Sequence, residues 1–358
     1  MGTFDPKLLS ELAAEYEERG EDPLPVYREL GAKGLAGLPF EPAYGGGGRP
    51  YREYLDLIEE LARSWVALAV GIGVHTLVCD AVQRFATEET RRELLPAMLA
   101  GERFGAYALT ESSSGSDAAS LRTRARKTEG GYSITGRKQF CTRGGEADHL
   151  LVMARTGGDG PKGVTAFVVD RHTPGFRPAH PERKMAWRSS PTWELVFENC
   201  HVPDDRRLGA DGEGFTIAMA ALDAGRLGIA ACAVGLAQAA CDEAVGHVRA
   251  VGAVRAAGAG EAGQGTEFML ADMATGIEAG RVLYQHAATL KDRGARYSQQ
   301  ASMAKLFCTD MAMRVTTDAV QIAGDGLTAR FFRESKALQI VEGTNQIQRM
   351  IIGRRLGS

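Results

Sequence analysis

The spacing of hydrophobic and polar residues changes twice along the chain and divides it into three parts. From about residue 5 to 105, apolar side chains recur every three or four positions, which is typical of amphipathic helices. From about 106 to 205 the period falls to two, and short β-branched or aromatic runs alternate with Gly, Pro and Asp, as in strands. After Pro203 the helical period returns.

Local signals place several elements within these parts. The segment TRARKTEGGYSITGRKQF predicts a hairpin about Gly130 and Gly131, and LLVMAR, GVTAFVVD and WELVFENCHV predict further strands. The run AYGGGGRP (43–50) predicts a loop, because four consecutive glycines lose too much chain entropy in a regular element. Residues 214–248 are rich in Ala and Gly and apolar on several faces, which predicts a helix inside a bundle.

Two further helical stretches follow, roughly 266–292 and 297–323. The sequence therefore predicts an α+β multidomain protein. Its parts are an N-terminal helical domain (1–105), a middle β domain (106–205) and a C-terminal helical bundle (206–358).

Composition narrows the class of protein. With 44% hydrophobic residues, 24% charged residues and a net charge of -3, the chain is typical of soluble globular proteins, and nothing favours nucleic-acid binding. The apolar stretch 65–82 carries His75 and Asp80, so we interpret it as a buried helix rather than a membrane span. The first residues lack a basic segment leading into an apolar one, which favours a cytoplasmic location without a targeting peptide.

The sequence lacks the motifs of several common kinds of functional site. The six cysteines are scattered without C-x-x-C or zinc-like spacing, so we expect reduced, mostly buried thiols and no metal site. There is no G-x-G-x-x-G after a strand, no G-x-x-x-x-G-K and no G-x-S-x-G. The Ser-rich segment TESSSGSD (110–117) is, on its own, a loop of turn-forming residues.

One carboxylate near the end of the chain stands out. In ALQIVEGTNQIQRMII (337–352) an apolar run stops at Glu342. Gly343 permits an irregular backbone, and Thr344 or Asn345 can cap the helix that follows. In that helix we expect an apolar face formed by Ile347, Met350 and Ile351. From these residues alone, Glu342 is either a loop residue before a cap or a functional acid or base.

Five segments, taken in order, resemble the acyl-CoA dehydrogenase family. They are YALTESSSGSD, GRKQFCTRGG, KMAWRSSPTWELVFENCHVP, LDAGRLGIAACAVGLAQAACDEA and IVEGTNQIQR. The resemblance runs nearly end to end and is strongest to the short-chain branch. It implies the acyl-CoA dehydrogenase fold, with a β-barrel-like middle domain and a C-terminal four-helix bundle.

The resemblance also implies FAD between the β domain and the C-terminal helices, with an acyl thioester against the flavin ring. Glu342 would be the base that removes the α-proton while a β-hydride passes to flavin N5. The backbone N–H of Glu342 and a ribityl hydroxyl would stabilise the enolate-like oxygen. In some relatives the base precedes the Arg of a D-x-x-R pattern, but that position here is Gly225, which leaves Glu342.

Family positions carry over to particular residues of this sequence. The cofactor residues implied are Tyr107, Leu109, Thr110, Ser116, Phe140, Thr142, Thr344 and Gln346. Phe140 replaces the usual Trp. The substrate-side residues implied are Ser116, Arg188, Asp223, Arg226 and Gly343, and Ser189, Ser190 and Thr192 share the block of Arg188. Arg226, three residues after Asp223, either forms a helix-surface pair or faces the active site.

Two cofactor elements depart from the family pattern. Val251 and Val254 occupy the Arg and Phe positions of the usual R-x-x-F-G, whose Arg reaches the FAD pyrophosphate of a neighbouring subunit. Arg249 or Arg255 is a possible substitute. The usual G-G-x-G-Y/F becomes AGDGL (323–327), where Asp325 would repel a pyrophosphate. The N-terminal region also looks shortened.

The leading hypothesis is a flavin-dependent dehydrogenase acting on a short or modified acyl group carried by coenzyme A or an acyl-carrier protein. Its electrons would pass to an electron-transfer flavoprotein, or to oxygen to give peroxide, and its assembly would be a homodimer or homotetramer. The alternative is a degenerate relative with weak or no FAD, acting as a non-redox thioester enzyme or as a partner subunit in a mixed oligomer.

Overall fold

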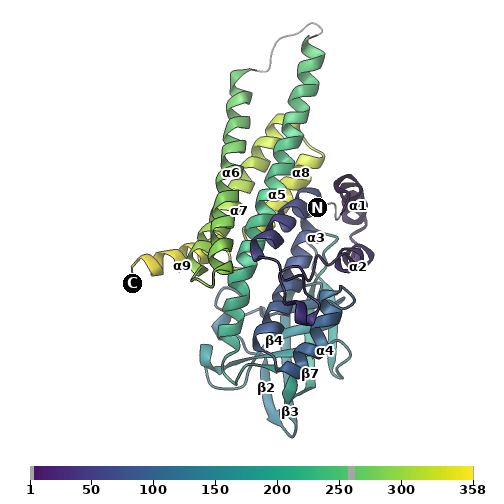
Figure 1. Cartoon of the computed structure of the whole chain (residues 1–358), viewed down its shortest axis with the longest axis vertical. Coiled ribbons are helices and arrows are strands. Elements are labelled where there is room, and N and C mark those ends of the chain that lie inside the picture. Colours follow the sequence, from purple (N-terminus) through teal and green to yellow (C-terminus); the bar gives the residue numbers. More distant parts are fainter. Residues whose placement is uncertain (1–3, 257–262, 358) are drawn as a thin grey trace.

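The computed structural model describes residues 4–256 and 263–357 and has the predicted order of helical, β and helical regions (Figure 1). The first region contains α1 (Pro6–Arg19), α2 (Leu24–Ala32), α3 (Tyr51–Phe85) and α4 (Glu88–Leu99). The last contains α5 (Gly214–Ala256), α6 (Gln264–Asp292), α7 (Ser298–Ala323), α8 (Leu327–Leu338) and α9 (Asn345–Leu356). The sheet lies at one end of the molecule, and the long helices α5 and α6 extend away from it.

Helix α1 is defined by its two ends and one buried face. The Asp5 side chain caps it by accepting the Lys7 N–H at 2.9 Å, and Gly20 ends it in a left-handed conformation with φ 70°. Its buried positions are Leu9, Ala13 and Glu17, spaced by four residues. The helix therefore turns one acidic residue toward the protein interior along with its apolar residues.

Helix α3 reverses direction at Trp65. That residue has φ -156° and ψ 91°, which are not helical values. The Tyr54 hydroxyl donates a hydrogen bond to Thr76 Oγ1 at 3.0 Å, although the two residues are 22 positions apart. A straight helix would separate them by about 33 Å. The two arms of α3, residues 51–64 and 66–85, therefore fold back beside each other.

The middle region is one eight-stranded sheet with the order β6-β7-β3-β2-β4-β5-β8, and β1 pairs with β4. The strands are β1 (Gly105–Ala108), β2 (Arg124–Thr128), β3 (Gly131–Thr142), β4 (His149–Arg155), β5 (Val164–Asp170), β6 (Phe176–Pro181), β7 (Thr192–Pro203) and β8 (Arg207–Leu208). The predicted hairpin is confirmed: β2 and β3 are antiparallel, with Thr128 opposite Gly131. Every residue of β4 is buried, because both faces of the sheet are covered there.

Helix α5 is the centre of the helical core. Its residues 227–237 are almost entirely buried, as predicted from the Ala- and Gly-rich sequence. Small residues let α3 approach closely: a Cβ atom at Gly235 would lie 2.2 Å from the backbone oxygen of Glu59. The predicted helices after it are present as α6 and α7.

Two helices, α3 and residues 214–252 of α5, are long and apolar enough to cross a membrane by length and composition alone. In the fold, 83% and 78% of their most apolar windows are buried, as in core helices of globular proteins. All six cysteines are buried and none forms a disulfide. The expectation of mostly buried thiols is confirmed.

The close approach of α3 and α5 can be tested with Gly235→Ala. The added methyl group collides with backbone rather than with a flexible side chain, so we expect the free energy of unfolding to fall by about 1–3 kcal/mol. The matched control is Gly246→Ala on the same helix, where a Cβ meets no atom within 4 Å and stability should rise by about 0.5–1 kcal/mol. Urea unfolding measures both, and equal stability of the two variants would contradict the packing described.

Candidate active site

Glu342 lies in a tight turn between α8 and α9. Its backbone is left-handed with φ 54°, and Gly343 follows with φ 88°. Only glycine adopts such angles without strain, so the conformation of Glu342 is maintained by its surroundings. Thr344 caps α9, as one of the two predicted residues, by accepting the Ile347 N–H at 3.4 Å.

Two buried side chains hold this turn. Lys305 Nζ, on α7, donates to the Gly343 carbonyl at 3.0 Å and to Asn345 Oδ1 at 2.8 Å. Gln348 Nε2 donates to the Gly343 carbonyl at 2.8 Å and to that of Glu342 at 3.3 Å. The predicted apolar face of α9 is therefore wrong: its buried residues are Asn345 and Gln348, whereas Met350 is 45% exposed.

The carboxylate of Glu342 sits in an unusual electrostatic environment. Its Oε2 atom is fully buried and has no hydrogen-bond partner among the described residues. Burial raises the pKa of Glu342 to about 7, although the positive charges of Arg226 and Lys305 act in the opposite direction. Burial also lowers the pKa of Lys305 to about 7, against the attraction of Glu342. Both groups therefore titrate near neutral pH, and each favours the charged form of the other.

Arg226 is buried beside this carboxylate and is 4% exposed. It forms an ion pair with Asp223, whose Oδ1 also accepts the Ser298 hydroxyl at 2.9 Å. The structure thus combines the two alternatives that the sequence left open. The Asp223–Arg226 pair forms, but it lies inside the protein and acts on Glu342.

A small cavity of about 10 Å³ opens beside Glu342. Both arms of α3 contribute to its wall, together with α5. Its lining residues are Tyr51, Tyr54, Ile58, Ala69, Val70, Gly73, Gly225, Gly228, Ile229, Cys232 and Glu342. A Cβ at Gly225 would lie 1.8 Å from Glu342 Oε2, so this glycine leaves the space that the carboxylate occupies. At Gly73 and Gly228 an added Cβ would meet no atom within 4 Å.

The loops at the ends of β3 and β7 carry most of the remaining backbone strain. Five described non-glycine residues have positive φ: Phe140, Arg143, Trp187, Asn199 and Glu342. Apart from Asn199, each lies in a segment implied by the family resemblance to border cofactor or substrate. Strain of this kind clusters at functional sites. Buried Trp187 Nε1 and Ser190 Oγ have no described partner, which fits a segment that offers hydrogen bonds to a bound group.

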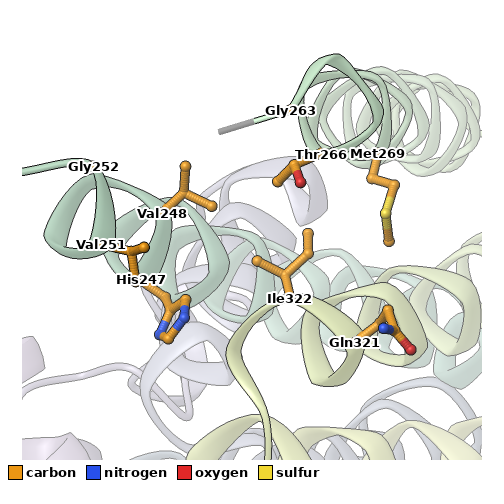
Figure 2. Close-up of a pocket in the computed structure, with 9 residues that line it drawn as sticks. All are labelled: His247, Val248, Val251, Gly252, Gly263, Thr266, Met269, Gln321 and Ile322. Carbon is orange, nitrogen blue, oxygen red and sulfur yellow. The ribbon is translucent and has the colours of Figure 1, made fainter. Parts of the chain in front are cut away.

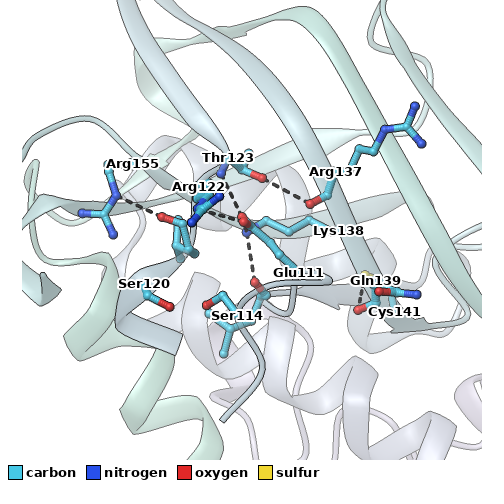
Figure 3. A network of polar contacts seen from close by, with 12 residues as sticks. Glu111, Ser114, Ser120, Arg122, Thr123, Arg137, Lys138, Gln139, Cys141 and Arg155 are labelled. Carbon is cyan, nitrogen blue, oxygen red and sulfur yellow. Dashed lines mark hydrogen bonds and ion pairs between the residues drawn. The ribbon is translucent and has the colours of Figure 1, made fainter. Parts of the chain in front are cut away.

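The TESSSGSD loop is fixed by a buried ion pair that sequence analysis missed (Figure 3). Glu111 is 7% exposed, binds Lys138 Nζ at 2.8 Å and accepts the backbone N–H groups of Arg122 and Thr123 at 2.6 and 2.9 Å. Lys138 also donates to the Leu109 carbonyl at 2.9 Å. The predicted cofactor residues Leu109 and Thr110 thus lie in a loop tied to β3.

The structure brings the predicted site residues together only in part. Tyr107 lies close enough to Glu342 that the carboxylate helps burial to raise the pKa of its hydroxyl. Thr142 pairs with Thr192 at the ends of β3 and β7. Ser116 and Gln346 are exposed, as is Phe140 at 58%. Arg188 is also exposed, and its guanidinium lies beside Gly20 at the end of α1 rather than in the cavity.

A second pocket, of about 270 Å³, lies at the far tip of the bundle (Figure 2). Val251 of α5 lines it together with Gln321 and Ile322 of α7, which directly precede the AGDGL segment (323–327). Its described lining contains no Arg or Lys, and Arg249 is not part of it. The side chains of Val254 and Arg255 lie outside the described residues.

The chain folds into a helical region, a sheet region and a second helical region. Together with a buried carboxylate that resembles a catalytic base and strained loops at one end of the sheet, this is the architecture of a flavin-dependent dehydrogenase. Comparisons with known proteins identify the family. Residues 4–102, 106–200 and 212–357 match the N-terminal, middle and C-terminal domains of acyl-CoA dehydrogenase, respectively. The chain belongs to the acyl-CoA dehydrogenase family, whose members are FAD-dependent oxidoreductases acting on acyl thioesters.

Individual relatives cover nearly the whole chain. An acyl-CoA dehydrogenase of Bacillus subtilis (strain 168) is 43% identical over 99% of this chain and 95% of its own length. The structure of butyryl-CoA dehydrogenase from Megasphaera elsdenii has a TM-score of 0.93 at 37% identity, covering 98% and 94% of the two chains. The prolyl acyl carrier protein oxidase AnaB has a TM-score of 0.89 at 26% identity, covering 99% and 98%.

The electrostatic pairing of Lys305 with Glu342 predicts the effect of Lys305→Met. Because the ammonium group stabilises the ionised carboxylate, its removal should raise the pKa of Glu342 further above 7, by roughly one unit. Infrared difference spectra between high and low pH measure this through the carboxyl C=O band, assigned by its loss in Glu342→Gln. Lys336→Met, at an exposed position on α8, is the control. An unchanged titration in Lys305→Met would contradict the pairing.

Proposed function

We propose that this protein introduces a double bond between carbons 2 and 3 of a short or modified acyl thioester, with Glu342 as the α-proton base. The observation that carries the proposal is the buried, unpartnered Glu342 Oε2 at the wall of a cavity. Such an oxygen has no competing donor among the described residues, so it can accept a proton from a bound substrate. A pKa of about 7 leaves a substantial fraction ionised at neutral pH.

The neighbouring groups support proton removal. An α-proton of a thioester is weakly acidic, so the base must be aligned and kept from water. The strained turn held by Lys305 and Gln348 fixes the direction of the carboxylate, and Gly225 leaves it room. Arg226 and Lys305 favour the ionised form that abstracts the proton. FAD, when bound, supplies the acceptor of the hydride from carbon 3, and the electron pair of the broken C2–H bond forms the double bond.

We propose that FAD binds against the loops at the ends of β1, β3 and β7. Tyr107, Leu109, Thr110, Ser116, Phe140 and Thr142 would line it, and Thr344 and Gln346 would approach it. The free donors of Trp187 and Ser190 and the strain at Phe140, Arg143 and Trp187 support this assignment. Arg226, Asp223 and Gly343 would border the acyl thioester. The exposed positions of Ser116 and Arg188 suit contacts with the outer part of a long carrier group.

A cavity of about 10 Å³ has the space of about one water molecule, so it must widen to admit any acyl group, and the short acyl chain is proposed from the likeness to short-chain relatives. The carrier would be coenzyme A or an acyl-carrier protein. Electrons would leave to an electron-transfer flavoprotein, or to oxygen as peroxide. We further propose a cytoplasmic enzyme that assembles as a homodimer or homotetramer.

A second function is favoured by one observation. The described lining of the tip pocket contains no Arg or Lys, although the family pattern puts a pyrophosphate-binding Arg at position 251. A protein with weak or no FAD would then use Glu342 as a non-redox acid or base on a thioester, or act as a partner subunit of a mixed oligomer. The strained flavin-side loops favour the dehydrogenase over this alternative.

The experiment that separates the two functions is the visible absorption spectrum of the purified protein, before and after incubation with FAD and gel filtration. We expect a retained flavin band near 450 nm that bleaches when a short acyl-CoA is added without oxygen. If no flavin stays bound after FAD is added, the dehydrogenase proposal is wrong.

Glu342→Gln tests the base. The amide keeps the size of the carboxylate but cannot accept the proton, so turnover should fall by about 10²–10⁴-fold while the flavin band and the melting temperature are retained. Glu129→Gln, in the exposed β2–β3 turn, should behave like wild type. Undiminished turnover in Glu342→Gln would place the base elsewhere.

Gly228→Ala tests the acyl cavity. Its methyl group enters open space, so the helix should not be destabilised, but the cavity becomes narrower. We expect kcat/KM for the best short acyl-CoA to fall by about tenfold or more, with a larger loss for branched chains. Gly246→Ala, on the same helix but outside the cavity, is the matched control. Equal kcat/KM values in the two variants would show that the acyl group lies elsewhere.

A further inference from the structure

The N-terminal region places two acidic side chains against the flavin-side loops. These are the loop after β3, which contains Arg143, and the loop before β7, which contains Arg188 and Ser189. Glu17, on the buried face of α1, is 8% exposed. Its Oε2 accepts the backbone N–H of Arg188 at 2.8 Å, and its Oε1 accepts the backbone N–H of Ser189 at 3.3 Å. The Ser189 hydroxyl also donates to Oε1. One carboxylate thus binds three donors of the loop before β7.

Asp22, between α1 and α2, holds the other loop. Its two carboxylate oxygens accept hydrogen bonds from Arg143 Nε and Nη2 at 2.6 and 3.0 Å. Arg143 is 2% exposed, and its guanidinium lies 3.8 Å from the ring centroid of Tyr27. A buried bidentate pair that also stacks on an aromatic ring fixes both position and orientation.

The two loops are also bonded to each other. The Arg143 N–H donates to the Pro191 carbonyl at 2.7 Å, and Thr142 is the β-sheet partner of Thr192. Arg143 and Trp187 both have left-handed backbones, with φ 52° and 55°. Strained residues keep such angles only where the surroundings over-determine them. Glu17 and Asp22 supply that constraint from a segment distant in sequence.

The same contacts reach the acyl cavity. Trp65 Nε1 donates to Ser189 Oγ at 3.1 Å. Trp65 is the residue at which α3 reverses, and the two arms that meet there form one wall of the cavity. Glu17 is therefore connected through Ser189 to both the flavin-side loop and the acyl-side hinge. Asp22, through Arg143, is connected to the flavin-side loops, and among the described residues no hydrogen bond joins it to Trp65.

We propose that Glu17 and Asp22 form an N-terminal clamp that sets the geometry of the flavin-side loops without touching the cofactor. Both are positioning residues, and Glu17 also fixes the acyl cavity through Ser189 and Trp65. The inference rests on the proposed dehydrogenase function, because the loops are assigned to the flavin by that proposal. It explains why the N-terminal segment carries buried carboxylates at an interface that apolar residues could fill.

The test compares Glu17→Gln and Asp22→Asn in the full-length protein with Glu11→Gln. Glu11 is exposed on the same helix and has only a 4.0 Å contact with Lys7. After removal of flavin, FAD is titrated back and its dissociation constant is measured by flavin fluorescence. Each clamp variant should bind FAD more weakly by about tenfold or more, because charged hydrogen bonds to the loops are lost. Glu11→Gln should match wild type.

Two further readouts separate positioning from general stability. Visible circular dichroism of the bound flavin should change in both clamp variants, while far-ultraviolet circular dichroism shows that the flavin-free protein, although less stable after loss of a buried charge, is still folded at the temperature of the titration. KM for a short acyl-CoA, measured with saturating FAD, should rise in Glu17→Gln and remain unchanged in Asp22→Asn. Wild-type FAD affinity and dichroism in both clamp variants would overturn the proposal.

If Glu17→Gln lowers the stability of the flavin-free protein, Ser189→Ala provides the second test. It removes only the hydroxyl that joins Glu17 to Trp65 and keeps the backbone donors. KM for the acyl-CoA should rise, and an unchanged KM would refute the link to the cavity. If wild-type protein binds no FAD at all, the proposed dehydrogenase function fails and the clamp fails with it. If wild-type protein binds FAD and only the clamp variants bind it more weakly, the result supports the clamp separately from the proposed function.

Discussion

The burial of one carboxylate without a hydrogen-bond partner is the constraint on which the site depends. Removing Glu342 Oε2 from water raises the free energy of the ionised carboxylate, and this raises its pKa to about 7. The left-handed turn that directs this oxygen inward is also unfavourable for a non-glycine residue. Both are tolerated because Lys305 and Gln348 bind the carbonyls of the turn and because Arg226 lies close by. These same features support the proposal that Glu342 acts as a base near neutral pH.

The helical core is built so that space exists at this place and at few others. Close packing of α3 against α5 is possible because Gly235 has no side chain. About two to three helical turns away from Gly235, Gly225 and Gly228 on the same helix face Glu342 and the cavity instead. A helix of uniform large residues would fill the cavity, and a helix of uniform glycine would not be stable. The distribution of glycines along α5 therefore separates the part that packs from the part that binds.

Local sequence patterns predicted the structural features that depend on neighbouring residues. They did not predict features that depend on contacts between residues far apart in the sequence. The period of hydrophobic residues was sufficient for the three regions and the β2–β3 hairpin, and Thr344 was one of the two residues predicted to cap the helix after Glu342. The reversal of α3 at Trp65 was missed because the residues around it are good helix formers, and the contacts that hold it come from far along the chain. The buried ammonium groups of Lys138 and Lys305 were not predicted. Lys305 lies on the buried stripe of α7 with Ala301 and Cys308, a helical spacing that could have revealed it.

Removal of a proton and a hydride from adjacent carbons requires the base and the hydride acceptor to be fixed relative to each other. Glu342 belongs to the C-terminal region, whereas the flavin-side loops belong to the sheet, and thermal motion between two regions would separate them. The N-terminal helices contact both regions, because α3 packs along α5 and its Trp65 bonds Ser189 beside Glu17, and α5 also packs directly on β4 and β5. These contacts are buried, and those of Glu17 and Asp22 are charge-assisted hydrogen bonds. On the proposed function, the first hundred residues would form the frame that holds the base and the hydride acceptor in register.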